Sequence, residues 1–419
     1  MDASTPSARR VLLLLTARSY RGEAFAQAAQ RLGVEVVPVV DMQAPLAEHW
    51  GYRLGVDFNR PAAAIQRIVD DAAQRPVSAI LAVDDSGVVL AAAAAQRLGL
   101  PHNNPDAARA ARDKFAMRTL MAAAGVPCPV FRRFAFDDDP AAVARQVDYP
   151  CVVKPLNLNG SRGVMRADSP AEFIPAVARL ARILAQEPPG AARTHYLVED
   201  FIPGREVALE GLLDQGKLTV LALFDKPDPL DGPFFEETIY VTPSRLPAAV
   251  QAAIADCAGR AAHALGLRMG PVHAELRVND QGPWMLEVAG RSIGGLCGQT
   301  LRFDADQSLE ELILRQACGL PIPSTQRAGR ASGVMMIPIP QAGILAGVDG
   351  VDAARAVPGI EEVTITARLH YPLVPLPEGD SYLGFIFARA ERPGEVETAL
   401  RAAHACLRFT VLPEFSLQG

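Results

Sequence analysis

Residues 272–291 read VHAELRVNDQGPWMLEVAGR, with polar and apolar side chains alternating on either side of a short turn. Successive side chains of a β-strand point to opposite faces of a sheet, so the alternation predicts strands over residues 272–278 and 284–288. The apolar face is formed by Val272, Ala274, Leu276, Val278, Trp284, Leu286 and Val288. The other face is formed by His273, Glu275, Arg277, Met285, Glu287 and Ala289.

The turn between these strands sets the expected register of the hairpin. If its five residues pair Val278 with Trp284, then Glu275 lies directly opposite Glu287. Like charges directly opposite destabilise a sheet, so this pair requires compensation. Either the neighbouring Arg277 or a divalent cation such as Mg²⁺, which binds carboxylates together with substrate phosphates, would supply it. The alternative is a solvated polar face, where salt screens the repulsion, and a slip of one residue would separate the two carboxylates.

Arg291 directly follows the second strand, in the glycine-containing segment GRSIGG over residues 290–295. A guanidinium placed there can bind a carboxylate or a phosphate with two parallel hydrogen bonds. The alternative is an ordinary surface arginine.

The composition is that of a folded, mildly acidic chain with about three domains. Its 419 residues contain 41 Lys plus Arg and 47 Asp plus Glu, which gives a net charge of −6 and disfavours a nucleic-acid or membrane-surface protein. The apolar run at residues 88–95 is far shorter than the roughly 20 residues of a membrane span. The six cysteines form no CxxC pair, which favours reduced thiols in a cytoplasmic protein.

The first hundred residues predict a parallel sheet, because strands alternate with helices. The expected strands are residues 11–15, 34–40 and 79–83, and the expected helices are residues 22–32, 61–73 and 88–98. Asp84 and Asp85 follow the third strand, at the edge where open α/β sheets bind ligands; capping of the next helix is the alternative. No GxGxxG motif follows the first strand, so a dinucleotide site is not supported.

The middle of the chain predicts further helices and a second sheet. The expected helices are residues 105–124, 170–184, 250–265 and 308–318. A strand is expected at residues 151–153, and strands of the second sheet at residues 196–199, 206–213 and 218–224. Residues 319–329 are rich in Pro, Gly, Ser and Thr and are expected to form a linker.

Two segments carry weak nucleotide-binding signals. Lys154 ends an apolar strand and a glycine loop follows at residues 157–163, where successive N–H groups can bind an anion; a plain turn is the alternative. Glu199 ends another apolar strand and Glu206 follows seven residues later. These groups suit an adenine edge and ribose hydroxyls, and an ordinary strand end with a solvated Glu is the alternative.

The order of these segments is more specific than any one of them. Lys114, the Lys154 strand, the glycine loop, the VEDFIPGRE segment and the two-glutamate hairpin follow one another along the chain. This order resembles the ATP-grasp superfamily of carboxylate–amine ligases over about residues 104–319. It looks closest to the L-amino acid ligase branch, which includes dipeptide ligases of the bacilysin alanine–anticapsin type. Segments at residues 333–340, 358–360, 375–379 and 382–385 support that branch.

The resemblance implies a mixed α/β ATP-grasp fold in three parts. Residues 1–104 would form an N-terminal Rossmann-like α/β domain, and residues 105–320 the ATP-grasp domain. Within the latter, residues 128–202 would form a nucleotide-binding lid and residues 203–320 a metal and substrate subdomain. Residues 321–419 would form a C-terminal α/β domain.

The resemblance also implies the ligands of ATP. The phosphates would be met by Lys114 and Lys154 and by the closing loop with Gly160, Ser161, Gly163 and Val164. The adenine would lie at Glu199, Phe201 and Ile202, and the ribose at Glu206.

The metal and substrate ligands implied by the resemblance lie on the hairpin and beside it. Glu275 and Glu287 would bind Mg²⁺ (Mn²⁺ being an acceptable replacement), and Arg291 would hold the substrate carboxylate and the acyl phosphate. His273 would line the amino acid pocket. Apart from the resemblance, residues 224–238 are expected to rim the substrate pocket, where carboxylates such as Glu237 could receive an α-ammonium group; a solvent-exposed hairpin is the alternative. Ala289 stands where many relatives have an Asn ligand, which leaves the shell of a second metal open.

The implied reaction is ATP-dependent formation of an amide between two amino acids through an acyl phosphate, with ADP and phosphate released. The expected partners are small molecules, with no nucleic acid or membrane; a homodimer is left open. Two alternatives remain: another ATP-grasp ligase or carboxylase, acting on bicarbonate or a purine-type substrate, and a non-catalytic ATP-binding module. The presence of both lysines, both glutamates and Arg291 argues against the second.

Overall fold

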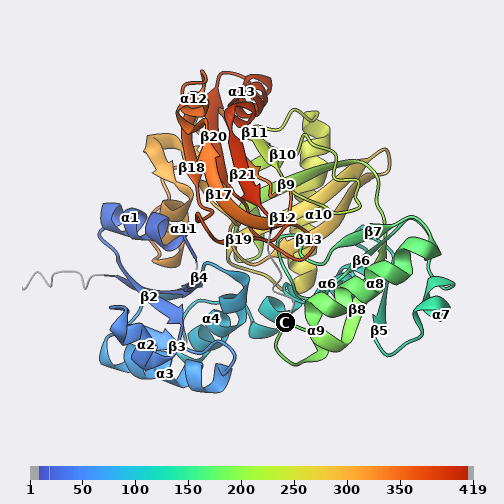
Figure 1. Ribbon diagram of the computed structural model, residues 1–419. Helices are drawn as coiled ribbons and strands as arrows, with labels where there is room; N and C mark the ends of the chain where they lie inside the picture. The colour runs from blue at the N-terminus through green and yellow to red at the C-terminus, as the bar shows by residue number, and fades with distance from the viewer. Residues whose placement is uncertain (1–8, 18, 414–419) are drawn as a thin grey trace, which may run out of the picture.

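The computed structural model describes residues 9–17 and 19–413, and its first part is a parallel sheet with the order β3-β2-β1-β4 (Figure 1). Its strands are β1 (Arg10–Thr16), β2 (Glu35–Asp41), β3 (Leu54–Val56) and β4 (Ala79–Ala82). Its helices are α1 (Gly22–Leu32), α2 (Ala44–His49), α3 (Pro61–Gln74) and α4 (Asp85–Arg97). The predicted parallel βαβ arrangement is confirmed, although α2 and β3 are too short to have given a periodic signal.

Two helices, not one, occupy residues 105–124, so that prediction is wrong. Helix α5 (Pro105–Ala110) stops, and α6 (Lys114–Ala123) starts again after Asp113. The Asp113 carboxylate accepts hydrogen bonds from the N–H groups of Phe115 and Ala116, which makes it the N-cap of α6. The break places Lys114 at the first position of a helix, with its direction fixed by the cap.

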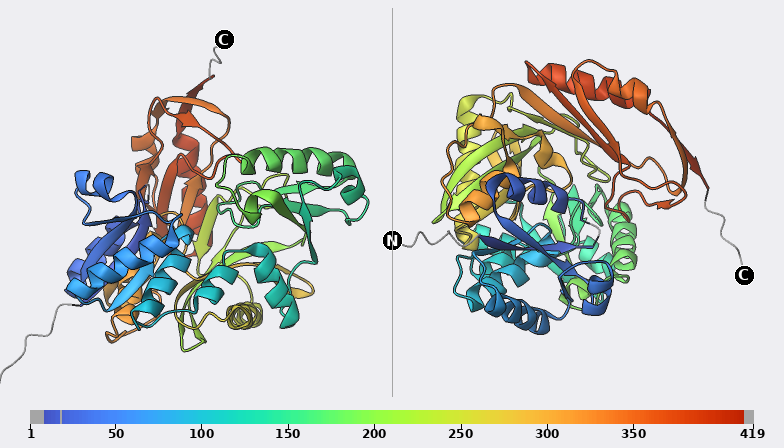
Figure 2. Two further views of the ribbon diagram at one scale, coloured as in Figure 1. Left: turned by 90° about the horizontal axis from the view of Figure 1, so that it is seen from below. Right: turned by 90° about the vertical axis from the view of Figure 1, so that its left-hand side faces the viewer.

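A four-stranded antiparallel sheet with α8 (Pro170–Leu184) packed on it lies in the part of the chain that was predicted to form a lid, and it is called the lid below (Figure 2). Its strands, in the order β5-β8-β6-β7, are β5 (Phe131–Ala135), β8 (His195–Asp200), β6 (Cys151–Lys154) and β7 (Met165–Ala167). Two short helices, α7 (Pro140–Ala144) and α9 (Ala191–Thr194), complete it. The prediction that residues 196–199 share a sheet with residues 206–224 is wrong: β8 pairs with β5 and β6, and alternation alone does not identify a strand's partner.

An eight-stranded antiparallel sheet, in the order β13-β12-β9-β10-β11-β16-β20-β18, joins the middle of the chain to its C-terminal part. Its strands are β9 (Arg205–Asp214), β10 (Lys217–Asp225), β11 (Ile239–Thr242), β12 (Gly270–Asn279), β13 (Gly282–Ala289), β16 (Ala331–Ile337), β18 (Ile360–Ile365) and β20 (Gly384–Ala390). Helix α10 (Ala248–Leu265) packs on β13, and α13 (Pro393–Cys406) on β16 and β20. The sheet is continuous across the boundary expected at residue 321, through the β11–β16 pairing.

The β12–β13 hairpin contains a bulge that the sequence did not reveal. Near the turn Val278 pairs with Pro283, so the predicted pairing of Val278 with Trp284 is wrong. An extra residue on β13 then shifts the register by one, and Glu275 does pair with Glu287, as predicted. The bulge also moves Met285 into the buried apolar cluster and leaves Leu286 lining the cavity described below, the reverse of the predicted faces.

The remaining elements connect and cover these sheets. Strands β17 (Gly343–Asp349), β19 (Pro372–Leu373) and β21 (Arg408–Leu412) form a three-stranded sheet beside α12 (Val351–Arg355). The short η1 (Cys297–Thr300), β14 (Arg302–Phe303), η2 (Asp304–Asp306) and β15 (Gln307–Ser308) lead into α11 (Leu309–Ala317). Ser308 and Glu311 form a capping box that begins α11 at the predicted place.

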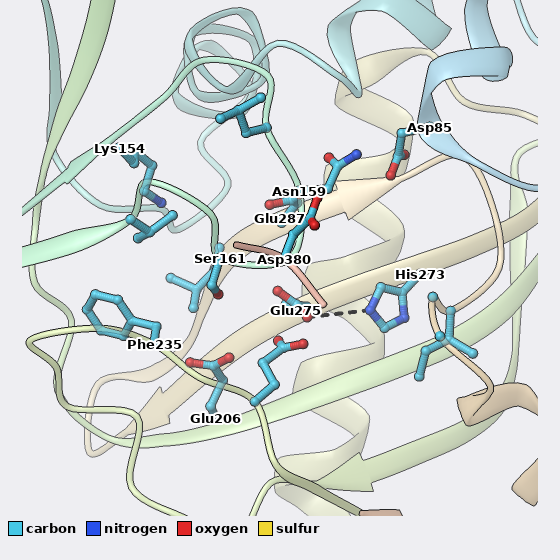
Figure 3. A pocket seen from close by; sticks show the side chains of 18 of the residues that line it. Asp85, Lys154, Asn159, Ser161, Glu206, Phe235, His273, Glu275, Glu287 and Asp380 are labelled. Atoms are coloured by element: carbon cyan, nitrogen blue, oxygen red, sulfur yellow. Dashed lines mark ion pairs between the residues drawn. The ribbon is translucent and has the colours of Figure 1, made fainter. Parts of the chain in front are cut away.

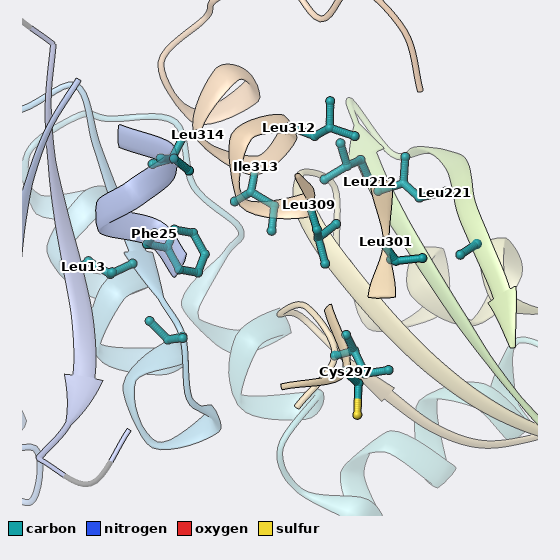
Figure 4. Close-up of a cluster of buried hydrophobic side chains, with 14 of the residues drawn as sticks. Leu13, Phe25, Leu212, Leu221, Cys297, Leu301, Leu309, Leu312, Ile313 and Leu314 are labelled. Atoms are coloured by element: carbon teal, nitrogen blue, oxygen red, sulfur yellow. The ribbon is translucent and has the colours of Figure 1, made fainter. Parts of the chain in front are cut away.

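Helix α11 fixes the N-terminal sheet against the large one. Figure 4 shows Phe25 of α1 facing Ile313 and Leu314 of α11, while Leu309 of the same helix faces the large sheet. All four side chains are buried in one continuous apolar cluster. Burial on both sides of one helix therefore holds two sheets in a fixed relation and sets the walls of the cavity between them.

No helix in the described part of the chain is both long enough and apolar enough to cross a membrane.

Candidate active site

A cavity of about 410 Å³ is lined by the N-terminal sheet, the lid, the large sheet and the C-terminal segment after β19 (Figure 3). Every residue predicted from the sequence to act in the site lines it, with the exception of Gly163. The N–H of Gly163 instead donates to the carbonyl oxygen of Pro377, 2.8 Å away. Folding therefore brings together predicted residues that are up to 207 positions apart, counted from Asp84 to Arg291.

Lys154 lies at the end of β6 in a buried three-charge cluster. Its Nζ is 2.7 Å from Glu199 Oε2, and Arg118 Nε is 2.7 Å from Glu199 Oε1. Burial opposes the ionised form of Glu199, but the two cations outweigh it and lower the pKa of that carboxyl. Burial also lowers the pKa of Lys154, although Glu199 counters the effect. The Glu199 carboxylate is thus occupied by Lys154 and Arg118, and positions them.

Arg118 was missed in the sequence, although it contacts both the lid and the hairpin. Its side chain is completely buried, and its Nη2 donates to the carbonyl oxygen of Leu286, the bulged residue of β13, at 2.6 Å. The sequence contained one signal for a buried role of Arg118: it lies between the apolar residues Met117 and Met121. In the structure both methionines belong to a buried apolar cluster.

Lys114 connects the glycine loop to the hairpin. Its Nζ donates to the carbonyl oxygen of Leu158 at 2.9 Å and lies 3.2 Å from Glu287 Oε2. The ammonium and a carboxylate of the predicted metal pair are therefore already in contact across the cavity.

The second carboxylate of that pair belongs to a cluster around Lys226, a buried residue for which no role was predicted. Lys226 Nζ is 2.9 Å from Glu206 Oε1 and 3.0 Å from Glu275 Oε1, and it also donates to Glu237. Burial would lower the pKa of Lys226, but the three carboxylates raise it well above its usual value. Lys226 thus neutralises Glu275, the role that Arg277 was predicted to share; Arg277 instead pairs with Glu206 and Asp231.

The pKa values of two of these carboxyls are shifted in opposite directions. Burial and the charge of Glu275 raise the pKa of Glu237 to about 7. Burial acts the same way on Glu275, but Lys226 and His273 outweigh it and hold the pKa of Glu275 well below its usual value. Glu275 is therefore ionised at neutral pH, whereas the pKa of its neighbour Glu237 lies close to neutral pH.

The donor set fits a hard divalent cation. Glu206, Glu237 and Glu275 each offer a carboxylate oxygen within 4.8 Å of the others, which is the ligand type that such a cation takes. The ammonium of Lys226 donates to all three carboxylates, so it would have to move or share them if an ion bound there. The convergent set found in the described residues contains Glu275 but not Glu287, which faces the same cavity from the paired strand.

His273 lies on β12 two residues before Glu275 and is held by carboxylates on both ring nitrogens. Nδ1 is 3.2 Å from Glu210 Oε2, and Nε2 is 3.5 Å from Glu275 Oε1 (Figure 3). Burial alone would lower the pKa of His273, but its hydrogen bonds to Glu210 and Glu275 raise the value to about 9. Both Glu210 oxygens also accept from the N–H of Ile293, which anchors the segment after Arg291.

Arg291 is paired with the N-terminal sheet. Its Nε and Nη2 lie 2.7 and 2.6 Å from Asp85 Oδ2, so Asp85, in the first turn of α4, fixes the guanidinium. Asp84 takes the N-cap position of α4 without capping it, and accepts instead from Thr16 and Ser19. The two aspartates therefore line the cavity, and the predicted alternative, capping of α4, is not found for Asp84.

The predicted adenine segment is ordered by arginines. Arg277 Nη1 donates to the carbonyl oxygen of Ile202 at 3.0 Å, and the guanidinium carbons of Arg166 and Arg277 lie 4.1 and 4.9 Å from the centre of the Phe201 ring. Phe235 stacks on the same ring with 6.4 Å between the ring centres. The Phe201–Ile202 segment is thus held rigidly at the edge of the cavity.

Three families match successive parts of the chain: the ATP-grasp N-terminal domain over residues 26–102, the ATP-grasp domain over residues 147–300, and the L-amino acid ligase C-terminal domain 2 over residues 335–412. The chain belongs to the ATP-grasp superfamily. Its fold is also that of a solved L-amino acid ligase from Bacillus licheniformis, with a TM-score of 0.83, 26% identity, and coverage of 97% of this chain and 100% of the other. These matches assign the chain to the ATP-dependent carboxylate–amine ligases, close to the L-amino acid ligases.

Two further relatives have names that describe different activities. Alanine–anticapsin ligase of Bacillus subtilis is 26% identical over 273 residues, which span 61% of this chain and 57% of that protein. Formate-dependent phosphoribosylglycinamide formyltransferase of Burkholderia pseudomallei is 29% identical over 386 residues, which span 85% and 86% of the two chains. The two relatives share the superfamily with this chain, but their names give different substrates.

Proposed function

We propose that this protein joins two amino acids, or an amino acid and a closely similar amine, at the expense of ATP. One observation carries the proposal: a single cavity combines an anion-binding side with a carboxylate cluster that already holds a primary ammonium, that of Lys226. A ligase for amino acids needs both, because its substrates bring a phosphate, a carboxylate and an ammonium to one place. The match to the L-amino acid ligase C-terminal domain supports it.

The anion-binding side would hold ATP and the acid. Lys114 and Lys154 would neutralise the phosphates, together with the N–H groups of the glycine loop, and Arg291 would bind the substrate carboxylate. That carboxylate attacks the γ-phosphorus of ATP; the bond from this phosphorus to the bridging oxygen breaks, and ADP leaves. The product is an acyl phosphate, and the role of the protein is to align the reactants and to stabilise their charge.

The amine completes the reaction. Its nitrogen attacks the acyl carbon after the ammonium has lost a proton to solvent or to a nearby carboxylate, and it loses a second proton in the same way as the amide forms. The carbon–oxygen bond to the phosphate breaks, and phosphate leaves with one oxygen from the original carboxylate. Glu237, which lines the same cavity as His273, would receive the ammonium of an amino acid substrate. Glu275 and Glu287 would hold Mg²⁺, which when bound neutralises phosphate charge.

The second candidate is a ligase of purine-type substrates, favoured by the long match to the formyltransferase. A ribosyl phosphate would need cations on the N-terminal side of the cavity. Among the described residues there, the Asp84 carboxylate accepts from Thr16 and Ser19 and forms no ion pair, and its charge would oppose a phosphate. Arg21 lines the same side, but its guanidinium already donates to the Val83 carbonyl oxygen and to Ser292. The charge of Asp84 therefore weighs against a phosphate and favours amino acids.

The test is a matrix of amino acid pairs incubated with ATP and Mg²⁺, scored for phosphate release and for products by mass spectrometry. We expect equal amounts of phosphate and of an amide that contains two amino acids. Parallel reactions contain formate or bicarbonate, with and without a phosphoribosyl amine. Turnover in those reactions, and none with amino acids, would overturn the proposal, and Glu287→Ala serves as the inactive control.

A further inference from the structure

The glycine loop of the lid is in contact with a distant segment, residues 374–382, here called the C-terminal loop. The N–H of Gly163 donates to the carbonyl oxygen of Pro377 at 2.8 Å. Gly160 has a positive φ of 59°, and a Cβ on it would lie 3.4 Å from the Cβ of Asp380. Gly160 and Asp380 both line the cavity, so the two loops meet at its edge.

Glu378 connects the C-terminal loop to two parts of the lid at once. Its carboxylate accepts two parallel hydrogen bonds from Arg179 of α8, at 2.6 and 2.8 Å. Its carbonyl oxygen accepts from Arg162 Nε at 2.8 Å, and the same guanidinium pairs with Glu187 just after α8. In both views of Figure 2 the lid helix lies beside the orange C-terminal region.

We propose that Glu378 is a positioning residue that holds the lid closed over the cavity, so that the amine and not water reaches the acyl phosphate. The inference rests on the proposed function for the identity of the intermediate. The contact itself is independent of that chemistry, because it consists of direct hydrogen bonds from Arg179 of α8 and Arg162 of the glycine loop to Glu378.

The strength of the contact suits a lid that must open in every catalytic cycle. The side chains of Arg179 and Glu378 are 36% and 42% exposed, so solvent screens their attraction, although the paired geometry is favourable. Their hydrogen bonds raise the pKa of Arg179 and lower the pKa of Glu378, which keeps both groups charged at neutral pH. An exposed ion pair of this kind shifts the equilibrium between the open and closed lid by about fivefold. Binding of substrates or release of products can then shift the same equilibrium in either direction.

Loss of closure has a defined chemical consequence. Water that attacks the acyl phosphate breaks the same bond as the amine does, and it returns the free carboxylate and phosphate without an amide. ATP is then consumed with no product. The ratio of phosphate released to amide formed therefore measures how well the closed lid excludes water.

Hydrogen–deuterium exchange of the free protein tests the contact without any assumption about the reaction. In Glu378→Gln we expect the amides of residues 158–166, including that of Gly163, to exchange about fivefold faster than in the wild type. Glu378→Asp keeps the charge and should restore part of the protection. The matched control is Glu361→Gln, which removes the half-exposed partner of Arg389 within the C-terminal region. Equal exchange in Glu378→Gln and the wild type would overturn the proposal.

The ratio of phosphate to amide tests the consequence. We expect a ratio near one for the wild type and for Glu361→Gln, and about three- to fivefold higher for Glu378→Gln, while the KM for ATP changes less. Faster lid exchange with an unchanged ratio would contradict the role in excluding water. If the wild type forms no amide with any amine, the proposed function fails, and the exchange experiment still decides whether Glu378 holds the lid.

Discussion

The cluster of Arg118, Lys154 and Glu199, where α6 meets the lid strands β6 and β8, and the contact between the lid and the C-terminal loop both border the same cavity, but their charged groups differ in exposure to solvent. Arg118, Lys154 and Glu199 are almost completely buried, whereas Arg179 and Glu378 are more than a third exposed. Breaking a buried pair leaves an uncompensated charge, which is far more costly than losing a solvated one. The difference separates groups that must keep a fixed geometry from groups that must move.

The largest expected effect is on the buried side. Arg118→Met removes the cation that pairs with Glu199 and leaves that carboxylate with Lys154 alone. We expect a loss of about 3–5 kcal/mol in the free energy of unfolding, because the remaining buried charge is poorly compensated. Urea denaturation followed by circular dichroism measures it, and a loss below about 1 kcal/mol would place this cluster with the exposed pairs.

The next effect concerns the paired carboxylates. Glu287→Ala removes one of the two carboxylates that face each other across the hairpin, and we expect kcat to fall about a hundredfold with an intact fold. Steady-state phosphate release at several Mg²⁺ concentrations measures the change. An unchanged kcat at limiting Mg²⁺ would remove Glu287 from the metal assignment.

A smaller effect is expected at Lys226, whose ammonium lies among three carboxylates. In Lys226→Met we expect a loss of about 2 kcal/mol in the free energy of unfolding in EDTA. The loss is smaller than at Arg118 because Glu237, with its pKa raised to about 7, can take up a proton. Mg²⁺ should restore more stability to this variant than to the wild type, since the ion replaces the missing charge. Equal Mg²⁺ effects on the thermal midpoints of the two proteins would contradict the account.

The smallest effect is expected at the exposed contact. Arg179→Met should change the free energy of unfolding by less than about 1 kcal/mol, because solvent screens the lost pair. The same urea titration that measures Arg118→Met gives the value. A loss comparable to that of Arg118→Met would mean that the lid contact is part of the rigid structure and not a contact made for opening.

The sequence predicted the parallel N-terminal sheet and the pairing of Glu275 with Glu287, because both depend on local periodicity and turn length. The pairing is nevertheless correct only through the bulge at Leu286, which offsets the error at Val278 and which no local pattern indicates. The sheet of β8 was wrong for a related reason: strand partners are chosen by long-range packing.

The site was predicted unevenly for physical reasons. Residues next to a strand end or in a glycine loop, such as Lys154 and Gly160, have a local signal, and they line the cavity. Lys226 and Arg118 have none, because their importance comes from carboxylates on other elements: 11, 20 and 49 positions away for Lys226, and 81 positions away for Arg118. Glu378 lies 199 positions from its partner Arg179 and becomes visible only when the lid and the C-terminal loop are in place.

The most direct test of the proposed chemistry follows one oxygen atom. The acid substrate is labelled with ¹⁸O in its carboxylate and converted in the presence of ATP and the amine, and the released phosphate is analysed by mass spectrometry. An acyl phosphate route transfers one carboxylate oxygen to each phosphate, so we expect phosphate with one ¹⁸O for every amide formed. Amide formation with unlabelled phosphate would contradict the account.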